Sequence, residues 1–211
     1  SSIKKINIKK IINKFKLLKK VNKSSFIFYS SNDNKSHLYN ILATLSSINL
    51  FIDIKKLKKN IFLNFKTPNG RGDISKIKIK DKVIFLVDET YNSNPLSLKT
   101  AIENYDKIKT KKSLKYLILG DMLELGKHSH RQHKLISKIL NKTKINQVFV
   151  IGKYIRETFK GLKSNKKAKI LNNKIDIIDL IKKDLNNNDY LMIKGSNSTG
   201  LHNITNNLKQ R

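Results

Sequence analysis

The chain has 211 residues, which is enough for one large domain or for one domain and part of a second. It has no cysteine, which excludes a disulfide framework, a thiolate zinc site and a cysteine nucleophile. Its 45 Lys and Arg residues against 15 Asp and Glu residues give a formal charge of +30. The basic residues are nearly all lysines spread along the whole chain, whereas nucleic-acid readers favour arginine and interleaved aromatic rings. We therefore predict no specific nucleic-acid partner.

The first third of the chain gives a mixed pattern. Residues 1–30 alternate short apolar and lysine-rich pieces and predict a single strand, at 25–29. A turn is predicted at 31–34, followed by a helix over 37–50 whose apolar residues share one face. A second, shorter helix is predicted over 52–62.

The segment from Thr67 to Asp73 (TPNGRGD) is the strongest linker signal, so we place a domain boundary between 1–66 and 67–211. Strands and helices then alternate. Strands are predicted near 74–79, 83–88, 115–119, 147–151, 167–171 and 190–194. Helices are predicted near 95–107, 129–142, 153–161, 175–185 and 200–209. This alternation predicts an α/β fold, a Rossmann-like and mostly parallel sheet with helices on both faces.

A polar run, residues 88–95 (DETYNSNP), follows an apolar stretch that predicts a strand buried on both faces. Asn94 is a good N-cap, and Pro95 suits the first turn of the next helix. Carboxylates and amides would then lie at the carboxyl edge of the sheet, where an acidic residue such as Asp88 can accept both hydroxyls of a ribose. A strand-to-helix turn that uses Asn, Ser and Pro only for its geometry explains the same run.

Two glycine-containing motifs point to charged ligands. In Gly70-Arg71-Gly72, the flanking glycines let a guanidinium approach a phosphate closely, although a flexible hinge would look the same. Residues 120–126 (GDMLELG) hold two carboxylates, Asp121 and Glu124, at a spacing that suits an ammonium group. Acids that cap a helix would have the same spacing.

A third motif, residues 194–200 (KGSNSTG), places small hydroxyls and one lysine at a helix start, where backbone N–H groups bind anions. It is not a P-loop, because Leu201 and His202 stand where Lys and Ser or Thr are required. The histidines at 128, 130 and 133 lack the spacing and the carboxylate of a metal site, so we predict no metal ligands and a solvated helix start there.

Together these motifs resemble one family, the Mur ligases that add D-alanyl-D-alanine to the peptidoglycan precursor. Residues 88–95 resemble its DDxYNANP signature, 120–126 with His133 its GDMxELG…H segment, and 194–201 its KGSxxxGL segment. Gly70-Arg71-Gly72 falls where the family carries an invariant arginine, and residues 40–43 (NILA) are similar to its NxLA helix start. The chain departs from the pattern at three positions: Glu89 replaces an aspartate, Asn197 an arginine and Ser36 a histidine.

The resemblance implies a ligase of three domains. Residues 1–66 would be the C-terminal remnant of the central ATPase domain, and 67–211 the complete C-terminal Rossmann-like domain. The P-loop and most magnesium ligands would precede Ser1, so this chain alone would be inactive. In the family's reaction, ATP with Mg²⁺ phosphorylates the carboxylate of UDP-MurNAc-tripeptide, and the amine of D-alanyl-D-alanine attacks the acyl phosphate.

The resemblance also implies roles for individual residues. The predicted catalytic residues are Arg71 and Lys194. The predicted nucleotide-binding residues are Asn40, Arg71, Asp88, Tyr91, Asn92 and Asn94. The predicted contacts to the dipeptide or the acyl phosphate are Asp121, Glu124, Lys194 and Ser196. We expect a monomer in the cytoplasm without membrane insertion, since no apolar stretch reaches spanning length.

Two alternatives differ in class from this ligase. One is a noncatalytic α/β module that binds nucleotides or polyanions. The other is a different amide ligase of the same superfamily, against which the Tyr-Asn-x-Asn-Pro and Gly-Asp-Met runs argue. The third residue of the tripeptide is not predictable from these residues.

Overall fold

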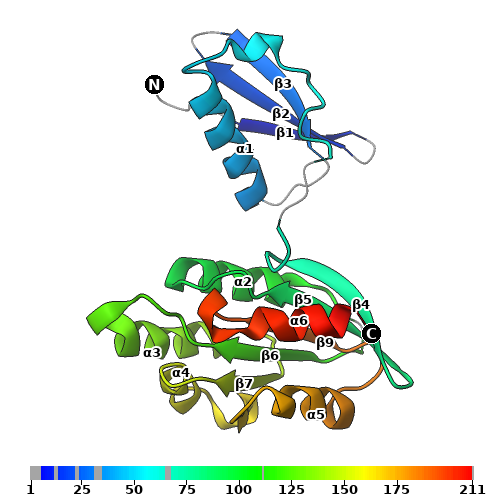
Figure 1. Cartoon of the computed structure of the whole chain (residues 1–211), viewed down its shortest axis with the longest axis vertical. Helices are drawn as coiled ribbons and strands as arrows, with labels where there is room; N and C mark the ends of the chain where they lie inside the picture. The colour runs from blue at the N-terminus through cyan, green and yellow to red at the C-terminus, as the bar shows by residue number, and fades with distance from the viewer. Residues whose placement is uncertain are drawn as a thin grey trace. The chain divides into compact units, whose positions relative to one another are not determined.

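The computed structural model describes residues 6–11, 14–21, 24–30, 35–64, 68–110 and 112–210. The chain divides into two compact units, Ser1–Thr67 and Pro68–Arg211 (Figure 1). No helix in these described ranges is long and apolar enough to cross a membrane. The assignment of the first unit to an ATPase domain stays a prediction.

The first unit contains an antiparallel sheet in the order β1-β2-β3 and one long helix. Its elements are β1 (Ile6–Ile11), β2 (Lys14–Val21), β3 (Ser24–Ser30), α1 (Lys35–Ile48) and the 3₁₀ turn η1 (Ile54–Lys56). Its core joins β3, α1 and the segment after η1. The core residues are Phe28, Leu38, Ile41, Leu45, Ile54 and Phe62. The predicted turn at 31–34 lies outside the described residues.

Two predictions for this unit were wrong. The helix predicted over 52–62 is only the single turn η1, which begins where the Asp53 carboxylate accepts the Lys55 N–H and ends at the extended residue Leu57. The chain then runs in turns, and the Lys59 carbonyl accepts the N–H of Tyr29. The sequence analysis also missed β1 and β2, because lysines, which are depleted in strands, interrupt their apolar residues.

The second unit contains a six-stranded sheet in the order β4-β5-β9-β6-β7-β8. The strands are β4 (Asp73–Ile79), β5 (Lys82–Glu89), β6 (Lys115–Gly120), β7 (Gln147–Ile151), β8 (Lys167–Ile170) and β9 (Tyr190–Lys194). Only β4 is antiparallel to its neighbour; the other pairs are parallel. The predicted mostly parallel α/β sheet is confirmed.

Helices cover both faces of this sheet, as predicted (Figure 1). The helices are α2 (Pro95–Lys107), α3 (Ser129–Leu140), α4 (Arg156–Lys160), α5 (Ile175–Asp184) and α6 (Leu201–Lys209). Short 3₁₀ turns are η2 (Gly126–His128), η3 (Ser164–Lys166) and η4 (Asn197–Thr199). One apolar core contains side chains of α5 and α6, and the other contains side chains of α2 and α3. Alternate residues of β6, such as Leu117 and Ile118, enter the two cores in turn, so the strand is buried throughout.

The start of α2 follows the predicted local chemistry. The Asn94 side chain accepts the Ser97 N–H at 2.8 Å, and the Ser97 hydroxyl accepts the Asn94 N–H at 3.0 Å, a reciprocal capping box. Pro95 occupies the first helical position. These contacts fix the direction in which the chain leaves β5, and with it the position of the DETYNSNP segment.

Candidate functional site

Three strand ends meet at the carboxyl edge of the sheet. Lys194 at the end of β9 pairs with Glu89 of β5 on one side and with Leu119 of β6 on the other. The segments that follow these strands therefore lie together, and they are the three motifs that the sequence analysis singled out. Glycines permit this approach: a Cβ added to Gly195 would lie 3.3 Å from the Cα of Gly120.

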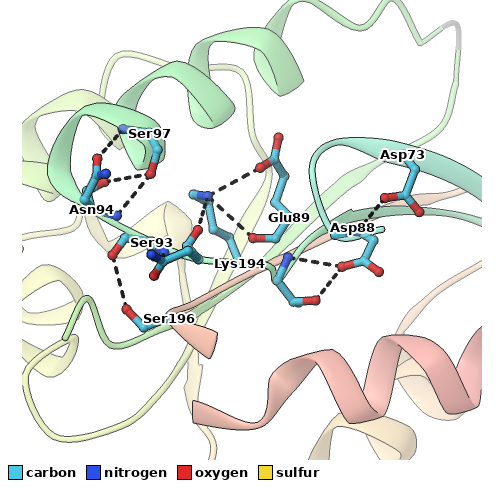
Figure 2. A network of polar contacts seen from close by, with 11 residues as sticks. Asp73, Asp88, Glu89, Ser93, Asn94, Ser97, Lys194 and Ser196 are labelled. Atoms are coloured by element: carbon cyan, nitrogen blue, oxygen red, sulfur yellow. Dashed lines mark hydrogen bonds and ion pairs between the residues drawn. The ribbon is translucent and has the colours of Figure 1, made fainter. Parts of the chain in front are cut away.

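Lys194 is the centre of this edge (Figure 2). Its side chain is only 2% exposed, and its ammonium donates to the Asn92 carbonyl at 2.9 Å and lies 3.3 Å from the Glu89 carboxylate. A third contact, 3.5 Å long, reaches the Glu89 carbonyl. Burial lowers the pKa of Lys194, and the Glu89 charge opposes that shift. Lys194 thus ties β9 to the DETYNSNP segment.

Glu89 is a site residue that the sequence analysis did not select. Its side chain is 21% exposed, and burial raises the pKa of its carboxyl while Lys194 opposes the shift. The sequence signal that could have identified Glu89 is strand alternation, because neighbouring residues such as Asp88 and Glu89 must point to opposite faces of β5. Asp88, which the sequence analysis selected, is the more buried of the two.

Ser196 joins the same segments. Its hydroxyl donates to the Ser93 carbonyl at 3.1 Å, as Figure 2 shows, and accepts the Leu123 N–H at 2.9 Å. Its own N–H donates to the Asp121 carbonyl at 3.0 Å. Ser196 is buried, so its hydroxyl is already used in holding the three segments together.

The two carboxylates of the GDMLELG segment have different surroundings. Asp121 is 8% exposed, and its oxygens accept the N–H groups of Lys153 at 3.0 Å and Ile155 at 2.7 Å. Glu124 is exposed, with a left-handed backbone at φ 64°. Of these two residues, Glu124 is the one exposed to solvent.

His133 holds the GDMLELG segment in place through a buried hydrogen bond. The prediction of a solvated helix start was wrong for this residue, which is fully buried on α3. Its Nε2 accepts the Met122 N–H at 2.9 Å, and its Nδ1 lies 2.8 Å from the Ser129 carbonyl. Burial lowers the pKa of His133, although the Ser129 carbonyl and the Asp121 charge oppose the shift. A neutral imidazole with its proton on Nδ1 satisfies both contacts.

Arg71 lies at the rim of the site, between two glycines with positive φ of 79° and 91°. The guanidinium is exposed and lies 4.0 Å from the centre of the Tyr91 ring, in cation–π contact. The turn is joined to β5, because the Gly70 carbonyl accepts the Tyr91 N–H at 3.0 Å and Gly72 donates to the Asp88 carbonyl at 2.7 Å. The Arg71 guanidinium is thus held over the Tyr91 ring, and both residues are exposed to solvent.

The other predicted nucleotide-binding side chains are engaged within the chain. Asp88 is 1% exposed, with one oxygen accepting from the N–H and hydroxyl of Thr90 and the other bonded to Lys209 at 2.6 Å. The Asn92 side chain accepts its neighbour's N–H, and Asn94 caps α2. Their roles toward a nucleotide stay predictions, and Asp88 is buried in this arrangement, so its carboxylate is not open to a ribose.

Asn40 lies on α1 in the first unit, where its side chain is exposed. Its role toward a nucleotide stays a prediction. Within the described residues, no group of three or more His, Cys, Asp or Glu side chains is arranged to hold a metal ion.

Residues 74–197 match the family model described as the Mur ligase, glutamate ligase domain. The chain belongs to the Mur ligase family. The resemblance drawn from the sequence motifs is confirmed. A UDP-N-acetylmuramoyl-tripeptide–D-alanyl-D-alanine ligase of Buchnera aphidicola (strain APS) is 30% identical over 171 residues, which are 80% of this chain and 35% of that protein.

Two further comparisons are with a second curated relative and with a solved structure. The Bacillus subtilis protein of the same name is 30% identical over 131 residues, which are 61% of this chain and 28% of that protein. The structure of the MurF ligase from Thermotoga maritima in complex with ADP has a TM-score of 0.69 and 20% identity, covering 97% of this chain and 45% of that one; this likeness concerns the fold alone. The chain spans about a third of the length of the curated relatives it matches.

Proposed function

We propose that this chain provides the C-terminal part of a ligase that uses ATP to join D-alanyl-D-alanine to UDP-MurNAc-tripeptide in peptidoglycan synthesis. The observation that carries the proposal is the meeting of three separate motifs at the ends of β5, β6 and β9. The curated relatives support the substrates, because those two proteins carry that ligase name. Since this chain spans only part of them, the activity belongs to the complete enzyme.

In this proposal Arg71 binds the phosphates of ATP. Its guanidinium is solvent-exposed and supported by the Tyr91 ring, so it can give two parallel hydrogen bonds to a phosphate. A cation at this point offsets charge on the phosphoryl group as it is transferred. The magnesium ion would be held mainly by ligands outside the described residues, which contain no carboxylate cluster for it.

Glu124 is the side chain that we assign to the ammonium group of the dipeptide, because it is exposed at the same edge. We assign a supporting role to Lys194, Ser196 and Asp121. All three are buried, and their polar atoms already hold the segments that present Glu124 and Tyr91. The role of Lys194 is thus to position the DETYNSNP segment rather than to contact the acyl phosphate.

We further propose that the complete enzyme is a cytoplasmic monomer. Its nucleotide-linked substrate and ATP would both be supplied in that compartment. Size-exclusion chromatography with light scattering of the complete enzyme tests the monomer, since a dimer mass would contradict it.

A test of the proposed function is to supply the missing part in trans. The chain would be combined with the N-terminal two-thirds of the Bacillus subtilis relative, with ATP, UDP-MurNAc-tripeptide and D-alanyl-D-alanine, and the pentapeptide product measured by mass spectrometry. We expect product with the wild-type chain, much less with Arg71→Ala, and partial recovery with Arg71→Lys. An associated and folded pair that gives no product would contradict the proposal and favour a noncatalytic nucleotide-binding module.

A further inference from the structure

A partly buried ion cluster lies beside the site and joins the last helix to the first strand of the second unit. The Lys209 ammonium, in the final turn of α6, contacts the carboxylates of both Asp73 and Asp88, the latter at 2.6 Å. The two aspartates are direct partners in the β4–β5 ladder, and both appear in Figure 2. One cation therefore serves two neighbouring carboxylates, one of which is almost fully buried.

Both aspartates also hold the turn that carries Arg71. The second oxygen of the Asp73 carboxylate accepts the Gly70 N–H at 2.8 Å, and the backbone carbonyl of Asp88 accepts the Gly72 N–H at 2.7 Å. Arg71 is thus bracketed by two hydrogen bonds, each to an aspartate that Lys209 contacts. Lys209 is therefore connected to the turn that carries Arg71 through Asp73 and Asp88, with a direct hydrogen bond at each step.

The electrostatics of the cluster depend on the lysine. Burial raises the pKa of the Asp88 carboxyl, but hydrogen bonds from Lys209 and Thr90 outweigh it and hold the pKa below its usual value. Burial lowers the pKa of Lys209, while its bonds to Asp73 and Asp88 raise it, and the raised value prevails. Without the ammonium, two like charges would face each other in a partly buried site.

We propose that Lys209 is a positioning residue for Arg71: by neutralising Asp73 and Asp88 it keeps the Gly70-Arg71-Gly72 turn closed against β5. The guanidinium is then held on the Tyr91 ring, facing outward. The functional consequence rests on the proposed function, in which Arg71 binds phosphate. The closure of the turn does not, and it can be measured without any activity.

The experiment is limited digestion of the folded chain with an arginine-specific protease. The chain has arginines at 71, 131 and 156 besides its last residue, so cleavage at Arg71 reports on the turn and the other two sites serve as internal controls. In Lys209→Met, we expect cleavage at Arg71 to become about tenfold faster, which corresponds to ~1.4 kcal/mol of lost local stability. Cleavage at the two control sites should stay unchanged.

Two further variants complete the test. Lys107→Met removes an exposed lysine from the last turn of another helix, α2, and should leave all cleavage rates unchanged. Lys209→Arg keeps the charge and should retain slow amide exchange at Gly70 and Gly72, measured by NMR, whereas Lys209→Met should lose it.

Unchanged cleavage at Arg71 in Lys209→Met would overturn the inference, and so would equal acceleration at all three arginines, which indicates loss of the whole fold. In the ligase reconstituted in trans, Lys209→Met should raise the KM for ATP more than it lowers kcat. Failure of the wild-type pair to ligate would count against the proposed function, while the digestion would still decide the role of Lys209.

Discussion

Replacing Asp121 with alanine is expected to destabilise the second unit by about 3–6 kcal/mol, because a hydrogen bond to an ionised group contributes about 1.5–3 kcal/mol and two are lost. The bonds in question are those from the N–H groups of Lys153 and Ile155, at 3.0 and 2.7 Å. Both donors would be left without this acceptor. Asp121 is 8% exposed, so water replaces the carboxylate only in part.

Urea unfolding followed by near-ultraviolet circular dichroism measures this loss, since five of the seven tyrosines lie in residues 68–211. Asp121→Asn, which keeps one carbonyl acceptor, should cost about half as much. Asp179→Ala, at an exposed position of α5, should stay within about 0.5 kcal/mol of wild type. If Asp121→Ala were equally close to wild type, the supporting role of Asp121 would be refuted.

Three other substitutions test the site. Gly70→Ala should lower the free energy of unfolding in urea by about 1–3 kcal/mol, because φ is +79° and the new Cβ would lie 2.8 Å from the Tyr91 nitrogen. Gly126→Ala, where nothing lies within 4 Å of the new Cβ, should lower it by less. Equal losses in the two variants would contradict this prediction. The folded-state pKa of His133 lies below its ordinary 6.5, so its contribution to stability is complete above about pH 6.5 and declines as pH falls through that value. His133→Asn should flatten the slope of unfolding free energy between about pH 5 and 7, and an unchanged slope would contradict the prediction. Lys194→Met should lower the free energy of unfolding by about 2–4 kcal/mol, because it leaves the Glu89 carboxylate unpaired. Wild-type stability in this variant would show that the Lys194 ammonium is not needed to hold the strand ends together.

Local patterns were sufficient to predict the second unit. Its central strands, such as β6, are mostly apolar runs, and α2 begins where Asn94 and Pro95 place its cap, so elements and their order followed from periodicity and capping. The first unit was predicted less well. In β2, four lysines among eight residues hide the alternation on which a strand prediction depends.

The site residues were found by motif, but their roles depend on contacts distant in sequence. Lys209 reaches Asp88 across 121 residues, and no local pattern indicates that pairing. Asp121 was predicted to contact the dipeptide or the acyl phosphate, yet the N–H groups that its carboxylate accepts lie more than 30 residues further along the chain. Motifs therefore identified the edge of the sheet, whereas only the fold distinguishes exposed side chains such as Arg71 from buried ones.

The most direct test of the central claim is phosphate release from ATP by this chain, alone and with the complementary N-terminal part, in the presence of UDP-MurNAc-tripeptide and with or without D-alanyl-D-alanine. The account predicts release only from the combined parts, and a rate that depends on the dipeptide. Release by the chain alone would contradict the prediction that this chain is inactive by itself. If the two parts associate but phosphate release does not depend on D-alanyl-D-alanine, the assignment of the carboxyl edge of the sheet to the second substrate would be contradicted.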